Sequence, residues 1–310
     1  MAVSTGRASG GPEQPVAAAP AGAAPEAAAG PAAAPAVPWE PDSYLRFADQ
    51  RVRPILDLIE HVPVRAPRLV ADLGCGPGNA TELFSDRWPR ARVVGVDSSA
   101  EMIGAAARRA RPGRLEFARA DLRTWRPSEP IDLLISNAAL QWVPGHLDLI
   151  PQLLGLVAPG GWFAFSVPGN YAAPSHTLLA DLQRAGRWSR RFTGEQVRPR
   201  SFEPAGYLHA LINANAGADA RVEVWETTYY HVLEGEDGAL DYARPTILRP
   251  VLAELGGPET EDARAFVAEY AAELREAYPP SELGGRIVQI MPYRRLFAIA
   301  RVASGSARRA

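Results

Sequence analysis

The sequence predicts an α/β fold, a doubly wound and mostly parallel sheet of seven strands with N-terminal helices and a helical cap insertion. Two observations predict this class. From Arg68 onward, short β-rich runs alternate with helical stretches, which is the pattern of a parallel sheet covered on both faces. Residues 69–84, LVADLGCGPGNATELF, place an apolar run, closely spaced glycines and an amphipathic run in succession, as a strand, a loop and a helix would.

The expected elements follow this alternation in order. The strands are RLVADL (68–73), RVVGVD (92–97), RLEFARAD (114–121), IDLLISN (131–137), GWFAFSVP (161–168), RVEVWETTYYHV (221–232) and a long strand or strand pair in IVQIMPYRRLFAIARV (287–302). Helices are expected in ATELFSDRW (80–88), AEMIGAAARRA (100–110) and HLDLIPQLLGLV (146–157). Residues from about 233 to 285 are expected to form the helical insertion, because Phe266, Tyr270 and Leu274 share one helix face.

The N-terminal part of the chain differs from the rest in composition. Residues 1–38 are almost entirely Ala, Pro, Gly and small polar residues. Few of these side chains can bury apolar area, so we expect a disordered tail over 1–38 and one domain over 39–310. Two helices are expected before the first strand, in DSYLRFADQ and ILDLIEHV, because Pro54 interrupts the pattern between them.

Composition excludes several classes of function. The net charge is −2 over 310 residues. The sequence has no basic stripe of the kind that indicates a nucleic-acid partner. All 33 basic residues are arginine, which excludes Walker-type phosphate loops and Schiff-base or pyridoxal enzymes. Cys75 is the single cysteine, so no disulfide and no cysteine-built metal site is expected, and a cytoplasmic location fits best. No apolar run has the length of a membrane span.

The glycine loop distinguishes between two kinds of ligand. Gly74, Gly76 and Gly78 can adopt positive φ and place no Cβ in the path of a ligand. A dinucleotide motif has its third glycine one position later, where this chain has Asn79. Asp72, just before the loop, would repel a pyrophosphate and attract an ammonium group. S-adenosylmethionine carries an ammonium and a sulfonium, so the sequence predicts S-adenosylmethionine as the cofactor.

Polar residues at the ends of the next three strands fit the same ligand. Asp97, followed by Ser98, ends the second strand and can accept hydrogen bonds from both ribose hydroxyls. Asp121 and Leu122 follow the third strand, where they could bind the adenine amino group and pack on its ring. Asn137 ends the fourth strand and is expected at the methionine end.

Four segments, DLGCGPGNAT, VGVDSSAEMI, ARADLRTW and LISNAALQWVPGH, resemble the Rossmann-like class I S-adenosylmethionine-dependent methyltransferases. A closer resemblance, over roughly 39–302, is to the trans-aconitate 2-methyltransferase family. It is carried by WEPDSYLRFADQRVRP, SNAALQWVPGH, ETTYYH, ILRP and RRLFAIAR. One departure is Val251 after ILRP, where the family pattern leads us to expect an aromatic residue.

The resemblance implies methyl transfer to a carboxylate of trans-aconitate, a small-molecule tricarboxylate. A carboxylate is ionised at pH 7, so no general base is required and no catalytic residue is assigned. The candidate substrate residues are Trp39, Tyr44, Gln141, Trp142, Tyr229, Tyr230, His231, Arg249, Arg294 and Arg295. Because successive strand residues face opposite ways, only one of each tyrosine and arginine pair is expected to face the cleft.

Several alternatives remain at this stage. The chain could methylate another small carboxylate or a malonyl ester on a carrier protein, although the cleft segments show no arginine cluster that would dock a carrier. It could be a non-catalytic S-adenosylmethionine-binding module, although the loop and its acid are intact. An NAD-dependent oxidoreductase is disfavoured by the glycine spacing. The sequence does not indicate the oligomeric state.

Overall fold

The computed structural model describes residues 48–192, 201–215 and 217–304, with side chains from Val52 onward. The expected tail and the candidates Trp39 and Tyr44 lie outside the described residues. Within the described ranges, no helix has both the length and the apolar character needed to cross a membrane.

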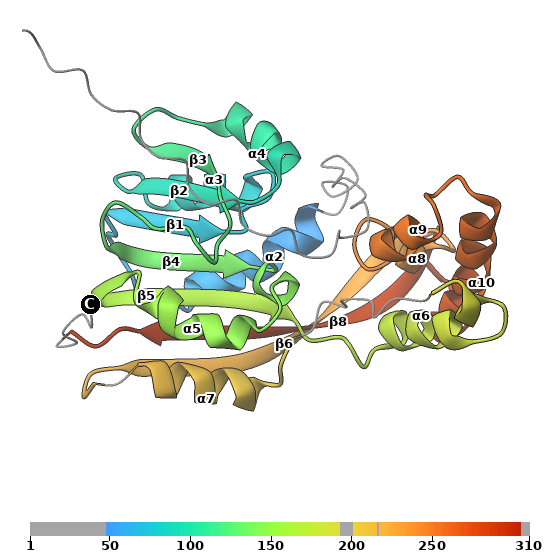
Figure 1. Ribbon diagram of the computed structural model, residues 1–310. Helices are drawn as coiled ribbons and strands as arrows, with labels where there is room; N and C mark the ends of the chain where they lie inside the picture. The colour runs from blue at the N-terminus through green and yellow to red at the C-terminus, as the bar shows by residue number, and fades with distance from the viewer. Residues whose placement is uncertain (1–47, 193–200, 216, 305–310) are drawn as a thin grey trace, which may run out of the picture. The chain divides into compact units, whose positions relative to one another are not determined.

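A mixed sheet organises the domain, and it confirms the predicted fold class. The strands are β1 Leu69–Leu73, β2 Arg92–Asp97, β3 Leu115–Arg119, β4 Ile131–Asn137, β5 Val157–Pro168, β6 Arg221–Glu234, β7 Ser281–Leu283 and β8 Arg286–Arg301. Their order is β3-β2-β1-β4-β5-β8-β6, with β7 paired to β8 outside this path (Figure 1). The first five strands pair in parallel, whereas β8 is antiparallel to both β5 and β6.

Parallel pairing brings several carboxyl-terminal strand ends to one edge of the sheet. Leu73 at the end of β1 pairs with Val96 near the end of β2, and Asn137 at the end of β4 pairs with Ser166 of β5. Loops that follow these ends therefore converge, although the third strand stops at Arg119 and leaves Asp121 in the loop beyond it. Ligands of open α/β sheets bind at this edge.

The helices form two layers on the sheet and a separate group. They are α2 Ala48–Glu60, α3 Asn79–Arg87, α4 Ala100–Ala106, α5 His146–Leu154, α6 Pro174–Arg184, α7 Pro204–Ala214, α8 Gly238–Ala243, α9 Arg249–Glu254 and α10 Glu261–Ala277, with single 3₁₀ turns at Ala107–Arg109, Leu140–Trp142 and Trp188–Arg190. Buried residues of α5 and α7 share one core with the sheet, and those of α2 and α3 share a second core on the other face.

The remaining helices surround the far ends of β6 and β8. Both strands continue past the other strands of the sheet toward α6, α8, α9 and α10 (Figure 1). Leu233 of β6 and Met291 of β8 are buried there in a third core, together with Phe266 and Tyr270 of α10. Helices α8, α9 and α10 occupy 238–277, inside the range expected for the insertion. Helices α6 and α7 are not among the elements expected from the sequence.

Helix α2 runs through Pro54, although two helices separated by this proline were expected. Proline removes one helical hydrogen bond, but it does not prevent a helix whose apolar face is buried. Ile55, Leu58 and Ile59 directly after the proline are 0–5% exposed and pack in the core under β1, β4 and β8. We infer that burial of this face maintains one continuous helix.

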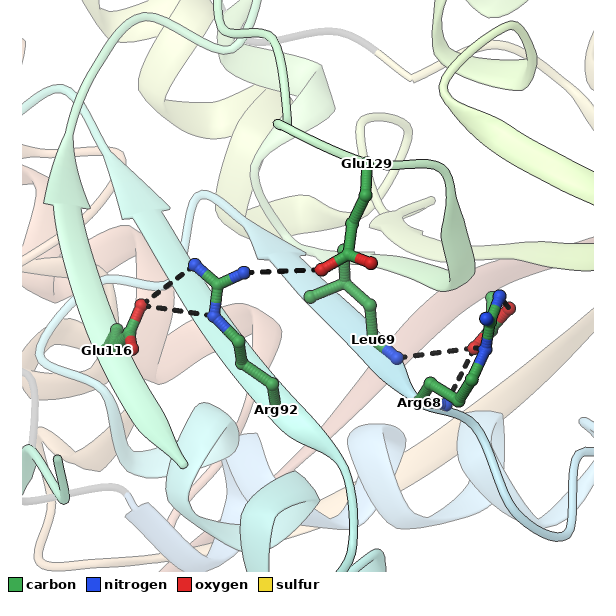
Figure 2. Close-up of polar contacts among 6 residues, drawn as sticks. Arg68, Leu69, Arg92, Glu116 and Glu129 are labelled. Atoms are coloured by element: carbon green, nitrogen blue, oxygen red, sulfur yellow. Dashed lines mark hydrogen bonds and ion pairs between the residues drawn. The ribbon is translucent and has the colours of Figure 1, made fainter. Parts of the chain in front are cut away.

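Ion pairs fix the opposite, amino-terminal edge of the sheet. Figure 2 shows the guanidinium of Arg92, at the start of β2, between the carboxylates of Glu116 and Glu129, at 3.0 and 3.5 Å. The amide of Arg68 donates to Asp132 Oδ2 at 2.6 Å, which links the starts of β1 and β4. Such exposed pairs contribute about 0–1 kcal/mol each, so they add little to the free energy of unfolding.

Packing against Ala139 requires a glycine at position 74, the first glycine of the loop. Gly74 has φ +74°, and a Cβ there would lie 2.1 Å from the Cβ of Ala139. Gly113 has the same φ, but a Cβ there would have no heavy atom within 4 Å. The two positions therefore carry the same backbone strain and differ in crowding.

We expect Gly113→Ala to lower the free energy of unfolding by about 1 kcal/mol, the cost of a left-handed alanine. Gly74→Ala should lose a further ~1–3 kcal/mol, because Ala139 and its loop must move aside. Urea unfolding of both variants measures the difference. Equal losses would show that the loop at Ala139 yields without cost.

Candidate functional site

A cavity of about 480 Å³ opens where the loops after β1, β2, β3, β4 and β5 converge. Residues of α2, of the segment around α8 and α9, and of β8 complete its wall. Nine of the ten predicted cofactor residues line it: Asp72, Gly74, Gly76, Asn79, Asp97, Ser98, Asp121, Leu122 and Asn137. Gly78 does not line the cavity. It packs against the ring of Phe117, which would lie 2.8 Å from a Cβ at this position.

Asp72 is the most deeply buried acid of the cavity, with 2% of its surface exposed. The hydroxyl of Thr81, in the first turns of α3, donates to Asp72 Oδ2 at 2.7 Å. Burial raises the pKa of Asp72 to about 7, and the bond from Thr81 opposes this rise. A buried carboxylate with such a pKa is stabilised in its charged form by any cation that enters the cavity.

Asp97 connects the end of β2 to the glycine loop. Its Oδ2 accepts from the amide of Gly76 at 2.9 Å, and its Oδ1 accepts from the amide of Ser99 at 2.9 Å. Each oxygen keeps a second lone pair for a ligand hydroxyl. Gly76 itself has φ +55° with open space where a Cβ would lie, so the loop leaves room for a ligand beside its backbone.

Asp121 is paired with its neighbour in the loop after β3. The guanidinium of Arg123 donates to both carboxylate oxygens of Asp121, and this contact lowers the pKa of the acid. Both residues line the cavity. A ligand amino group at Asp121 would therefore share the carboxylate with Arg123, an interaction that the sequence analysis did not foresee.

The loop after β4 contains a strained residue at the cavity. Ala138 has φ 53°, and it is the only non-glycine residue of the described ranges with positive φ. Its carbonyl accepts from Gln141 Nε2 at 2.7 Å, whereas Gln141 Oε1, also buried, has no partner among the described residues. Oε1 of Gln141 and the equally unpartnered Oδ1 of Asn79 are acceptors available to a bound ligand.

Four predicted substrate residues line the same cavity: Gln141, Trp142, Arg249 and Arg295. Arg295 is 4% exposed, and its Nε and Nη1 have no hydrogen-bond partner in the part of the chain that the structure describes. Arg249 begins α9, and its burial lowers its pKa. Val251, two residues later, lies in the third core and not in the cavity wall. Its identity therefore does not shape the lining.

The other described candidates lie outside the lining. Tyr229 donates to Asp57 of α2, at 2.6 Å, and Tyr230 is 68% exposed. His231 is buried and stacks on the ring of Tyr293 at 5.1 Å. Arg294 pairs with Glu203 and Glu226 instead of facing the cavity. Arg294 and Arg295 point to opposite faces because successive side chains alternate along β8.

The structure adds lining residues that sequence reasoning missed. Tyr171 and His176 follow the end of β5, and Tyr242 lies in α8. Tyr293 precedes Arg295 by two residues on β8, so both face the cavity, and its ring lies 5.3 Å from the Arg295 guanidinium carbon. Extending the strand-end rule to β5 would have found Tyr171, and period-two spacing would have found Tyr293, whereas His176 lies in α6 and gave no such signal.

Charge is distributed unequally along the cavity wall. Its carboxylates are Asp72 near the end of β1, Asp97 at the end of β2 and Asp121 in the loop after β3. Arg123 also lines the cavity on this side but is paired with Asp121, whereas Arg249 and Arg295 come from α9 and β8, together with the aromatic residues Tyr242 and Tyr293. The described residues hold no cluster of His, Cys, Asp and Glu that could bind a metal ion. The cavity can thus hold a cationic ligand at one end and an anionic one at the other.

The chain is similar to known proteins over most of its length. A family described as a methyltransferase domain matches residues 70–161. The trans-aconitate 2-methyltransferase of Streptomyces avermitilis is 51% identical over 273 residues, which cover 86% of this chain and 97% of that protein. The enzyme of that name from Escherichia coli is 40% identical over 263 residues, with coverage of 85% and 98%.

Among solved structures, the YcgJ protein of Bacillus subtilis has a TM-score of 0.53 at 12% identity. The match covers 82% of this chain and all of that one, and it shows a shared fold. The sequence relatives identify the family, because their identity extends over nearly their whole length, including the segments outside the cofactor loops. The chain belongs to the trans-aconitate 2-methyltransferase family.

Proposed function

We propose that the chain transfers a methyl group from S-adenosylmethionine to a carboxylate of trans-aconitate and forms its monomethyl ester. The activity named for the relatives supports the choice of acceptor. The observation that carries the proposal is the separation of charge in one cavity, with acids beside the glycine loop and the buried guanidinium of Arg295 on the opposite wall.

The loop side of the cavity fits S-adenosylmethionine in its chemistry. Asp72 would take the ammonium group, Asp97 the ribose hydroxyls, and Asp121 with Leu122 the adenine. The open side of Gly76 and the unpartnered oxygens of Asn79 and Gln141 are features that a ligand of this kind would occupy. When bound, S-adenosylmethionine supplies an electrophilic methyl group on a positively charged sulfur.

The opposite wall would bind and orient the acceptor. An acceptor carboxylate is ionised at pH 7, so no side chain has to remove a proton. Arg295, with two guanidinium nitrogens available, and Arg249 would hold carboxylates that do not react. Fixing these groups orients the third carboxylate toward the methyl donor, which is the main contribution that positioning makes to such a displacement.

Water exclusion would come from the aromatic lining and from a cap. Charge is neutralised as the carboxylate attacks, so water would stabilise the reactants more than the transition state. Trp142, Tyr171, Tyr242 and Tyr293 line the cavity and would surround the acceptor. We assign the segment containing α8, α9 and α10 as the cap, because Tyr242, Thr246, Ile247 and Arg249 reach the cavity from it.

Incubation with labelled S-adenosylmethionine tests the proposed reaction. The acceptors should include trans-aconitate, cis-aconitate, citrate and a malonyl thioester. We expect labelled ester from trans-aconitate well above the others. Label on the thioester with none on trans-aconitate would overturn the proposed acceptor.

The neighbouring arginines of β8 give a matched pair of variants. We expect Arg295→Gln to raise the KM for trans-aconitate about 10- to 100-fold, since a hydrogen bond to a charged group contributes roughly 1.5–3 kcal/mol. Arg294→Gln should leave that KM within about twofold, because an exposed ion pair contributes about 0–1 kcal/mol. Steady-state kinetics with saturating cofactor measures both. A similar KM change in both variants would remove Arg295 from the acceptor site.

Cofactor affinity should depend on pH through Asp72. Below its pKa of about 7, the acid is protonated in the free protein and must lose its proton before it pairs with the ammonium group. Affinity should therefore fall toward tenfold for each pH unit between about 7 and 5, and Asp72→Asn should remove this dependence. Calorimetric titration with S-adenosylmethionine up to about pH 7.5, where its amine stays largely protonated, measures the slope.

Thr81→Val provides the control for this pH dependence. It removes the hydroxyl that opposes the raised pKa of Asp72, so the midpoint should move to higher pH while the slope below it is unchanged. A midpoint that stays in place, or moves to lower pH, would separate the titration from Asp72.

A further inference from the structure

Helix α2 contributes to the wall of the cavity described above. Val52 and Ile55 line the cavity, and Asp57 lies two residues after Ile55 on the same helix. The helix packs on the sheet through the buried Leu58 and Ile59. Asp57 is not itself among the lining residues, but it lies on the helix that contributes Val52 and Ile55 to them.

The hydroxyl of Tyr229 binds this carboxylate. It donates to Asp57 Oδ2 at 2.6 Å, and the second oxygen of Asp57 lies 3.7 Å from Nε of the exposed Arg53. Tyr229 pairs in register with Tyr293, and Thr227 pairs with Arg295. Directly paired residues of antiparallel strands point to the same face, so Tyr229 lies on the face that carries Tyr293 and Arg295.

Two opposite charges therefore act on one phenol. Burial and Asp57 raise the pKa of Tyr229 above its usual range, whereas Arg295 and Arg53 lower it. A buried guanidinium ordinarily pairs with a nearby carboxylate. Instead, Nε and Nη1 of Arg295 have no partner among the described residues, and Asp57 is bound to the tyrosine and to Arg53.

We infer that Tyr229 is a positioning residue whose hydroxyl holds Asp57 on α2 away from Arg295, which keeps the guanidinium available for an acceptor carboxylate. The tyrosine need not contact the acceptor to have this effect, which agrees with its position outside the cavity lining. The anion at Arg295 rests on the proposed function, but the contact between Tyr229 and Asp57 does not.

A crystal structure of Tyr229→Phe tests the contact without any substrate. The variant keeps the ring, which packs against Phe297, and loses only the hydroxyl. We expect the Asp57 carboxylate to move within hydrogen-bond distance of the Arg295 guanidinium. A carboxylate that stays directed away from Arg295 would overturn the inference, whatever the enzyme methylates.

Kinetics with trans-aconitate tests the consequence. Tyr229→Phe should raise the acceptor KM at least tenfold and change the dissociation constant of S-adenosylhomocysteine less than twofold. Adding Asp57→Asn should return the KM to within about threefold of the wild-type value, because the competing charge is gone. Asp57→Asn alone, which can still accept from the tyrosine, should leave the KM near wild type.

The double variant separates positioning from two simpler roles. One simpler role is that Tyr229 contacts the acceptor directly, and another is that it only anchors α2. In either case, adding Asp57→Asn to Tyr229→Phe would not restore the KM. A double variant whose KM stays raised would therefore overturn the inference.

Tyr207→Phe is the control for loss of a buried hydroxyl, since Tyr207 bonds His146 outside the cavity. It should lower the melting temperature without changing the acceptor KM. If the wild-type enzyme ignores trans-aconitate while the crystal structure shows the new ion pair, the proposed function fails and the positioning role stands.

Discussion

The shape of the ligand site depends on the two hydrogen bonds that the Asp97 carboxylate accepts. By accepting from Gly76 and Ser99, this one side chain fixes the glycine loop after β1 to the loop after β2. The parallel register of β1 and β2 brings the two loops together, and the carboxylate fixes their spacing. The glycines of the loop have positive φ and no Cβ, so a ligand can lie directly beside their backbone.

Separation of charge follows from this arrangement. Asp72 and Asp97 occur at the ends of β1 and β2, and Asp121 lies in the loop just beyond β3. Arg249 comes from α9, beside the third core, and Arg295 comes from the part of β8 that pairs with β5 in the main sheet. The acids and Arg295 thus belong to strands of one sheet or to a loop beyond it, whereas Arg249 is added by the helices around the third core.

The fold class and the family resemblance were predictable because their signals are local. An apolar run, a glycine loop and an amphipathic helix are visible in one short segment, and the strand-end acids follow at regular intervals. Contacts between distant segments were not predictable in this way. The bond from Tyr229 to Asp57 spans 172 positions, and the continuity of α2 through Pro54 depends on burial against β1, β4 and β8. The pairing of Asp121 with Arg123 is local, but it competes with a ligand role that the sequence alone favours.

Strand β8 has a property that affects the whole domain. Leu296 belongs to the core beneath α5 and α7, its neighbour Phe297 to the core beneath α2, and Met291 to the core among α6, α8 and α10. A single extended segment is therefore a structural member of three hydrophobic clusters. Loss of any one cluster exposes part of the same strand, so we expect the three clusters to unfold together and cleavage between β6 and β8 to leave neither part with a complete core.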